Sequence, residues 1–168
     1  KGLKGGHSGL DINTGRANAI KILAHVLQLL REKATFGLAS IDAGDKHNAI
    51  PREAVAGLWL GDEARNALEQ LLEKVRQDIQ TWYGKTDPQA VLELNPAQDI
   101  MPPLAAKAAD RLIDFLLALP HGVLAMSQEV PGLVETSTNL AVVKTQKNTI
   151  AIVESSRSSI MPALRAVQ

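Results

Sequence analysis

The chain has 168 residues, 45% of them hydrophobic and 21% charged, which suits one globular domain with a sizeable core. Its 18 basic and 18 acidic residues cancel, and no apolar run approaches the roughly 20 residues that span a bilayer, so composition excludes nucleic acid and membranes as partners. The absence of cysteine excludes disulfides and thiolate metal sites, and it fits a cytoplasmic protein.

The chain begins with a glycine-rich loop, KGLKGGHSG, in which four glycines surround His7. Glycine allows a positive φ and a close approach of the backbone to a ligand, so His7 is expected to be exposed and held in place. Thr14 is expected to cap the following helix, in which apolar residues recur at helical spacing as far as Leu30. Residues 35–43 and 48–60 are predicted to form a hairpin around a polar turn.

A second amphipathic helix is expected to start at a capping Asp62 and to continue to about Trp82, and Gly84 then stops it. The remaining predicted elements are strand 90–94, helix 104–119, strands 133–144 and 149–155 joined by a Gln-Lys-Asn turn, and a helix that begins near Pro162. This order predicts an α+β fold with one antiparallel sheet and helices packed on one face. The other face, or an edge, would be free to meet a partner.

His7 is the first candidate for a functional residue. The loop is not a phosphate-binding P-loop, because Gly9 is followed by Leu10 rather than by the required lysine and hydroxyl. Ser8 does not lie in the Gly-x-Ser-x-Gly pattern of a nucleophile elbow. Two interpretations remain: a surface turn with an incidental histidine, or an imidazole that donates a hydrogen bond to an oxyanion or a carboxylate.

Asn48 and Arg157 are the other polar candidates. Asn48 lies where a polar turn enters a strand, so its amide either caps that turn or reaches a ligand, together with Arg52, from the rim of the sheet. Arg157 is flanked by four serines at the end of a predicted strand. It is either a solvated side chain or a guanidinium that binds a carboxylate through two hydrogen bonds.

The other histidines do not form a metal site in the sequence. His25, His47 and His121 are scattered, and none has a second ligand at metal-binding spacing. We therefore expect no metal ion to be bound by this segment.

Several blocks of the sequence together resemble one family. GLKGGHSG, NAIK, NAIPREA, GLVETSTNLAVV and ESSRSS occur in this order between Lys1 and about Ile160. They resemble the aminoacyl-histidine dipeptidases, also called Xaa-His dipeptidases or peptidase D, which belong to a dinuclear zinc metallopeptidase family. The resemblance implies that residues 1–168 are the lid or dimerisation domain of a two-domain enzyme, ferredoxin-like with insertions and cut from a longer chain at both ends.

The resemblance also implies roles for individual residues. His7 matches the lid histidine that contacts the substrate carbonyl and the oxyanion, and Asn48 matches an asparagine at the C-terminal end of the substrate. Arg157 matches the arginine that holds the terminal carboxylate, and Asn139 is a weaker candidate in the same cleft. The two zinc ions, or cobalt or manganese, would be bound by the catalytic domain, so this segment alone is not expected to be active.

The implied function is thus substrate binding by the lid of a zinc dipeptidase that hydrolyses Xaa-His dipeptides such as β-alanyl-histidine. The implied partners are the dipeptide, the catalytic domain of the same chain and a second subunit in a homodimer. Two alternatives stay open. The segment could be a non-catalytic dimerisation module that uses a free sheet edge, or an independent small-molecule-binding domain in which the glycine loop is an anion site.

Overall fold

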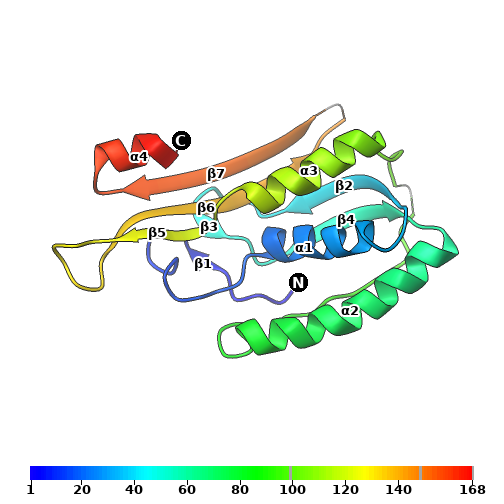
Figure 1. Ribbon diagram of the computed structural model, residues 1–168, viewed down its shortest axis with the longest axis horizontal. Coiled ribbons are helices and arrows are strands. Elements are labelled where there is room, and N and C mark those ends of the chain that lie inside the picture. The colour runs from blue at the N-terminus through cyan, green and yellow to red at the C-terminus, as the bar shows by residue number, and fades with distance from the viewer. Residues whose placement is uncertain (99, 148, 168) are drawn as a thin grey trace.

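The computed structural model describes residues 1–98, 100–147 and 149–167, and within them four helices lie beside a five-stranded antiparallel sheet and a small two-stranded one (Figure 1). The elements follow in the order β1 (Gly6–His7), α1 (Ala19–Arg31), β2 (Gly37–Ala43), β3 (Ala49–Ile50), β4 (Ala54–Trp59), α2 (Asp62–Tyr83), α3 (Ala106–Ala118), β5 (Gly122–Met126), β6 (Val134–Thr145), β7 (Ile150–Ser158) and α4 (Met161–Val167).

The long strand β6 organises the main sheet. Along one edge it pairs with β7, from Thr136↔Ser158 to Thr145↔Ile150. Its other edge is shared, because β5 pairs with its first half and β2 with its last residues. β4 continues the sheet beyond β2. The middle of this shared edge is therefore free to receive β3, which contacts β6 and pairs with β1 of the glycine loop.

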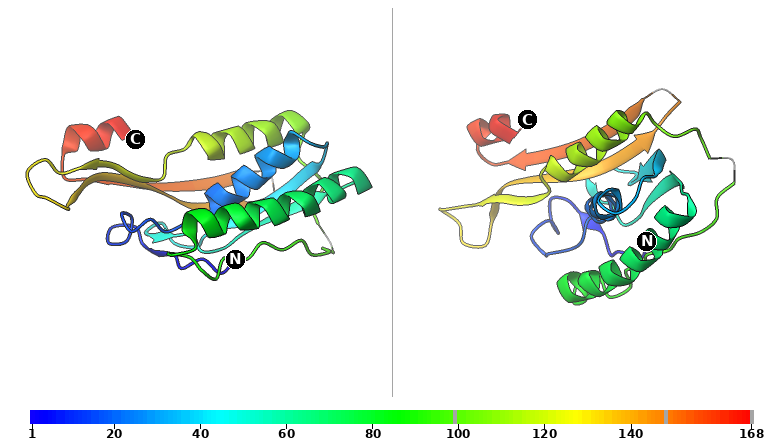
Figure 2. Two further views of the ribbon diagram at one scale, coloured as in Figure 1. Left: turned by 60° about the horizontal axis from the view of Figure 1, so that its bottom comes forward. Right: turned by 45° about the vertical axis from the view of Figure 1, so that its right-hand side comes forward.

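Helices α1 and α3 cover one face of the sheet, and α2 packs against the outer side of α1 (Figures 1 and 2). The main core forms between the sheet and helices α1 and α3. It consists of buried aliphatic residues that include Ile20, Leu27, Leu38, Ile41, Ile113, Leu116, Leu140 and Val143. A second apolar cluster joins α1 to α2. The predicted α+β fold, with an antiparallel sheet and helices on one face, is confirmed.

The helix α1 begins at Asn18 and not at Thr14, so the predicted cap is wrong. Asn18 Oδ1 accepts hydrogen bonds from the amides of Ile20 and Lys21, at 2.9 and 3.3 Å. Thr14 instead donates its amide and its hydroxyl to the carbonyl of Asp11, inside the glycine loop. A hydroxyl already used by a local turn does not cap a helix four residues later.

Lys21 joins the start of α1 to the end of α3. Its ammonium donates to the carbonyls of Leu116, Leu117 and Leu119, at 2.9, 2.7 and 2.8 Å. These are carbonyls that a helix leaves unpaired at its C-terminus, where a positive charge is also favoured by the helix dipole. Burial lowers the pKa of Lys21, and the nearby charge of Glu154 opposes that shift.

The predicted strand 48–60 is interrupted. Pro51 has no amide hydrogen to continue a ladder, and the structure places β3 before it and β4 after it, in different sheets. Asp62 is the first residue of α2, and Gly61 is its N-cap. β5 was not predicted, because a short apolar run after the Pro-His-Gly turn carries a weak signal. The expected Gln-Lys-Asn turn includes Asn148, which lies outside the described residues.

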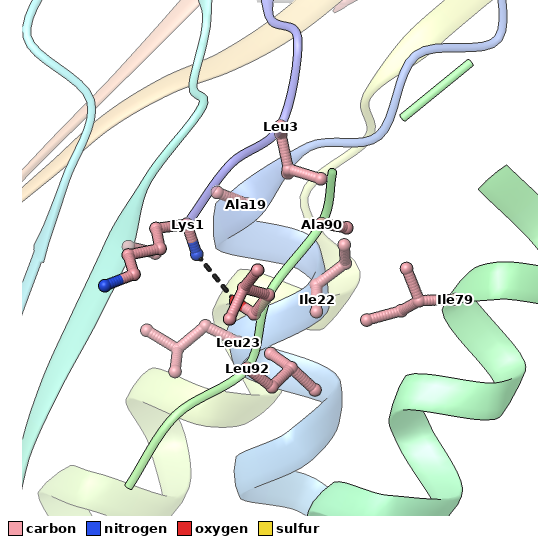
Figure 3. A pocket seen from close by; sticks show the side chains of 10 residues that line it. Lys1, Leu3, Ala19, Ile22, Leu23, Ile79, Ala90 and Leu92 are labelled. Atoms are coloured by element: carbon pink, nitrogen blue, oxygen red, sulfur yellow. Dashed lines mark hydrogen bonds between the residues drawn. The ribbon is translucent and has the colours of Figure 1, made fainter. Parts of the chain in front are cut away.

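The predicted strand 90–94 is wrong. The segment is irregular, and its one strand-like contact is a pair of backbone hydrogen bonds between Lys1 and Val91, at 2.9 and 2.8 Å. Its alternating apolar residues instead close an apolar cavity of about 40 Å³ between the N-terminal segment, α1 and α2 (Figure 3). The alternation of apolar residues in this segment therefore reflects the burial of every second side chain and not pairing with another strand.

His121 lies at the junction of α1, α3 and β6. Its Nδ1 accepts a hydrogen bond of 3.1 Å from Asn18 Nδ2, whose other proton is donated to the carbonyl of Leu140 at 2.8 Å. Burial lowers the pKa of His121 from 6.5 to about 4, and the charge of Lys21 adds to that effect. His121 is therefore neutral in the folded chain at neutral pH.

This low pKa makes stability depend on pH. Between pH 6.5 and about 4 the unfolded chain binds a proton at His121, whereas the folded chain does not. The free energy of unfolding therefore decreases by about 3 kcal/mol as the pH falls through this window. In chemical denaturation of the 168-residue chain, we expect His121→Gln to flatten this part of the pH profile. His47→Gln, at an exposed position, is the control, and an unchanged slope in His121→Gln would contradict the assignment.

Candidate functional site

A single buried carboxylate closes the glycine loop. Asp87, only 1% exposed, follows α2 and accepts the amide of Lys4 at 2.7 Å with Oδ1 and the amide of Ala17 at 2.9 Å with Oδ2. These two amides lie just before and just after residues 5–16. The loop therefore projects from the domain with both of its ends held by one side chain.

Two of its glycines are required by close contacts. Gly5 has φ +62°, and a Cβ there would lie 2.2 Å from Cγ of Arg52. Gly6 has φ +150°, and a Cβ there would lie 2.1 Å from Arg16 Nη1 and 2.6 Å from Asp11 Oδ2. Gly5 thus lets the loop pack against Arg52, and Gly6 lets it pack against its own side chains, both in conformations that other residues rarely adopt.

The loop presents His7 with one ring nitrogen already engaged. The imidazole is exposed, and its Nδ1 accepts a hydrogen bond of 3.1 Å from the amide of Gly9. In the neutral ring an accepting Nδ1 means that the proton is on Nε2. His7 therefore offers an N–H donor at Nε2.

Arg157 lies beside His7 although it comes from the far end of the chain. A Cβ built on Gly9 would be 3.3 Å from His7 Nδ1 and 3.5 Å from the guanidinium carbon of Arg157. The two side chains therefore lie close to each other, on the side of Gly9 where a Cβ would stand. β7 is longer than predicted and ends at Ser158, so Arg157 lies within the strand, opposite Ser137 of β6.

Asn48 joins the same region through β3. Its carbonyl accepts the amide of Ser8 at 2.9 Å, and the next residue, Ala49, pairs with His7. Asn48 and His7 both line a hollow of about 590 Å³ whose rim carries both charge signs, from Lys4, Asp45, Lys46, Arg52 and Glu53.

Asn139 lies beneath this hollow and is 1% exposed. Its Nδ2 donates to the carbonyls of Ala49 and His47, at 2.9 and 3.4 Å. These carbonyls lie on either side of Asn48, so Asn139 supports the backbone that carries Asn48. Its Oδ1 has no hydrogen-bond partner within the described residues.

The amides of the loop are satisfied internally. Those of His7, Ser8 and Gly9 donate to Asp11, to Asn48 and to the His7 ring, and those of Leu10 and Asp11 donate to the carbonyl of His7. No amide from residues 7–11 is thus left to cradle a phosphate. The polar groups left for a ligand are on exposed side chains: His7 Nε2–H suits a carbonyl oxygen, and the Arg157 guanidinium suits a carboxylate.

In residues 1–98, 100–147 and 149–167, no group of three histidine, aspartate or glutamate side chains is placed to hold a metal ion. None of the helices in these ranges combines the length and the apolar character needed to cross a membrane.

Known proteins resemble this chain in sequence and in fold. Residues 1–87 match the model of the peptidase dimerisation domain. The cytosol non-specific dipeptidase of Escherichia coli (strain K12) is 34% identical over 152 residues, which are 90% of this chain and 31% of that protein. The crystal structure of aminoacylhistidine dipeptidase from Vibrio alginolyticus superposes with a TM-score of 0.90 at 37% identity, over 99% of this chain and 34% of that one.

The chain belongs to the peptidase dimerisation domain family. The resemblance to the aminoacyl-histidine dipeptidases, seen first in the sequence blocks, is confirmed by the structural match. The chain spans about a third of the length of the two relatives.

Sequence reasoning missed three residues that hold the site together, namely Asp11, Arg16 and Asp87. Asp11 and Arg16 follow the glycines closely, so their charges within a loop were a usable signal. Asp87 is 83 positions from Lys4, and only the folded chain shows the contact.

Asp87→Asn is expected to destabilise the domain by about 1–3 kcal/mol, because one amide hydrogen would then face an NH₂ group in place of an acceptor. Thermal unfolding measures this loss, and hydrogen exchange at Lys4 and Ala17 should rise with it. Asp78→Asn, in the same helix but away from its N-terminus, is the matched control. Equal melting temperatures for the Asp87 variant and the unmodified chain would contradict this account.

Proposed function

We propose that this chain is the substrate-binding lid of a metal-dependent dipeptidase acting on Xaa-His dipeptides, such as β-alanyl-histidine. The observation that carries this proposal is the proximity of His7, an exposed side chain with a free Nε2–H donor, to the Arg157 guanidinium, since both lie within 3.5 Å of a Cβ built on Gly9. Two relatives described as dipeptidases support the reaction class, and one described as cytosolic supports a cytoplasmic location. The preference for histidine is drawn from the aminoacylhistidine dipeptidase match.

In the parent enzyme the catalytic domain would bind two zinc ions, or cobalt or manganese, which supply Lewis acidity and activate water. His7 Nε2–H would donate to the scissile carbonyl oxygen, and this bond would strengthen as negative charge develops there. Arg157 would hold the terminal carboxylate through two parallel hydrogen bonds, with Asn48 beside it. Closure of the lid would exclude water and complete the site together.

His7→Ala in the full-length enzyme is expected to lower kcat by about 10²–10³-fold and to change KM little, since the lost hydrogen bond matters most in the transition state. Steady-state hydrolysis of β-alanyl-histidine measures both constants. His25→Ala is the control, because His25 lies on α1 against Trp82, away from the loop. An unchanged kcat in the His7 variant would exclude the oxyanion role.

A second role, homodimerisation, is supported by the family to which the chain belongs and by an open surface beside α3. Among the described residues β7 pairs with β6 alone, so its outer edge is unpaired, and it carries neither proline nor lysine to block another strand. Beside it, Phe115 of α3 is 51% exposed. Phe115 borders a hollow of about 650 Å³ that also touches Ile150 and Ile152.

We expect Phe115→Asp to convert a dimer of the full-length protein into monomers, because a buried charge would replace an aromatic contact. Light scattering over a range of protein concentrations reports the mass. Val55→Asp is the control, at a position that is 67% exposed on β4, the opposite edge strand. A native protein that is monomeric at every concentration would rule out this role.

A further inference from the structure

We infer that Asp11 and Arg16 form a positioning pair that fixes the orientation and the tautomer of His7. The structural part of this inference concerns the loop alone, and its catalytic consequence rests on the proposed role of His7. Neither residue faces the substrate in that proposal. Both act through the backbone that carries the imidazole.

The first contact is made by the carboxylate of Asp11. Its Oδ2 accepts the amide of His7 at 2.8 Å, and its Oδ1 lies 2.7 Å from Arg16 Nη2. The same guanidinium donates through Nη1 to the carbonyl of Gly5. The ion pair thus holds the backbone at Gly5, two residues before the histidine, and at the histidine itself.

The pair is shielded from solvent. The side chains of Arg16 and Asp11 are 16% and 26% exposed, so water screens their attraction less than that of a surface pair. They also lie directly against Gly6, where a Cβ would clash with both. Gly6 is therefore the residue that lets the pair reach the backbone.

Every polar group of His7 other than Nε2 is then restrained by the next four residues. Its amide is held by the Asp11 side chain, its carbonyl accepts the amides of Leu10 and Asp11 at 3.0 and 2.8 Å, and Nδ1 accepts from Gly9. The contact from Gly9 selects the Nε2–H tautomer. Without the ion pair the turn would loosen, and the Nδ1–H tautomer would present a lone pair to the oxyanion.

Asp11→Asn in the full-length enzyme tests this role, because asparagine keeps the shape and one acceptor but loses the charge. We expect kcat to fall on the order of tenfold with KM nearly unchanged, as for a modest misplacement of a catalytic group. In a His7→Ala background the same substitution should have no further effect. Asp114→Asn is the matched control, because it breaks an ion pair between Arg31 of α1 and Asp114 of α3.

Nitrogen-15 NMR of histidine-labelled protein gives a readout independent of turnover. The native His7 should show a protonated Nε2 and an unprotonated, accepting Nδ1, whereas Asp11→Asn should show a mixture of tautomers. Arg16→Lys keeps the positive charge but loses the second nitrogen of the guanidinium. Its proportion of the Nδ1–H tautomer should lie between those of the native protein and Asp11→Asn. This milder variant preserves the test should Asp11→Asn fail to fold.

The outcomes separate the two proposals. A pure Nε2–H tautomer in Asp11→Asn, or an equal loss of kcat with and without His7, would overturn the positioning role and leave the function of His7 standing. An unchanged kcat in His7→Ala, together with mixed tautomers in Asp11→Asn, would instead remove the catalytic role and keep the positioning pair.

Discussion

The carboxylate of Asp87 is the contact on which the candidate site depends. A buried carboxylate without a cation beside it is costly unless its oxygens accept hydrogen bonds, and Asp87 meets this need with the amides of Lys4 and Ala17. In doing so it brings together the two ends of the glycine loop and attaches them to the end of α2. The position of the loop in the domain is therefore set by its contact with the end of α2, and local sequence alone does not specify it.

Asn18 and Lys21 attach the start of α1, which directly follows the same loop, to β6 and to α3. Asn18 caps α1 with one atom and donates to the carbonyl of Leu140 in β6 with the other. Lys21 satisfies the last carbonyls of α3. The NAIK block therefore fixes α1 against both of its neighbours within one helical turn. The loop that carries His7 ends directly before this turn, so these contacts also hold the end of the loop against the domain.

The polar residues of the candidate site are brought together around β6, one edge of which is shared by β5 and β2. β5 and β2 leave a gap between them, and β3 enters it with Asn48 while Asn139 holds the backbone on either side. On the opposite edge of β6, β7 carries Arg157 toward Gly9. Three distant parts of the chain thus meet beside β6, between Ser137 and Asn139. The same strand β7 leaves its outer edge for a partner.

Sequence by itself determined the elements whose signal is local. The periods of α1, α2 and α3, the two hairpins and the glycine loop around His7 all follow from neighbouring residues, whose spacing sets which face is apolar and whose glycines permit the turns. The family blocks named His7, Asn48, Asn139 and Arg157. Tertiary structure decided the rest, because each choice depended on a partner distant in the chain. Asn18 rather than Thr14 caps α1, segment 90–94 is buried without a strand to pair with, Asp87 closes the loop, and Arg157 lies beside His7 only once β6 and β7 are paired.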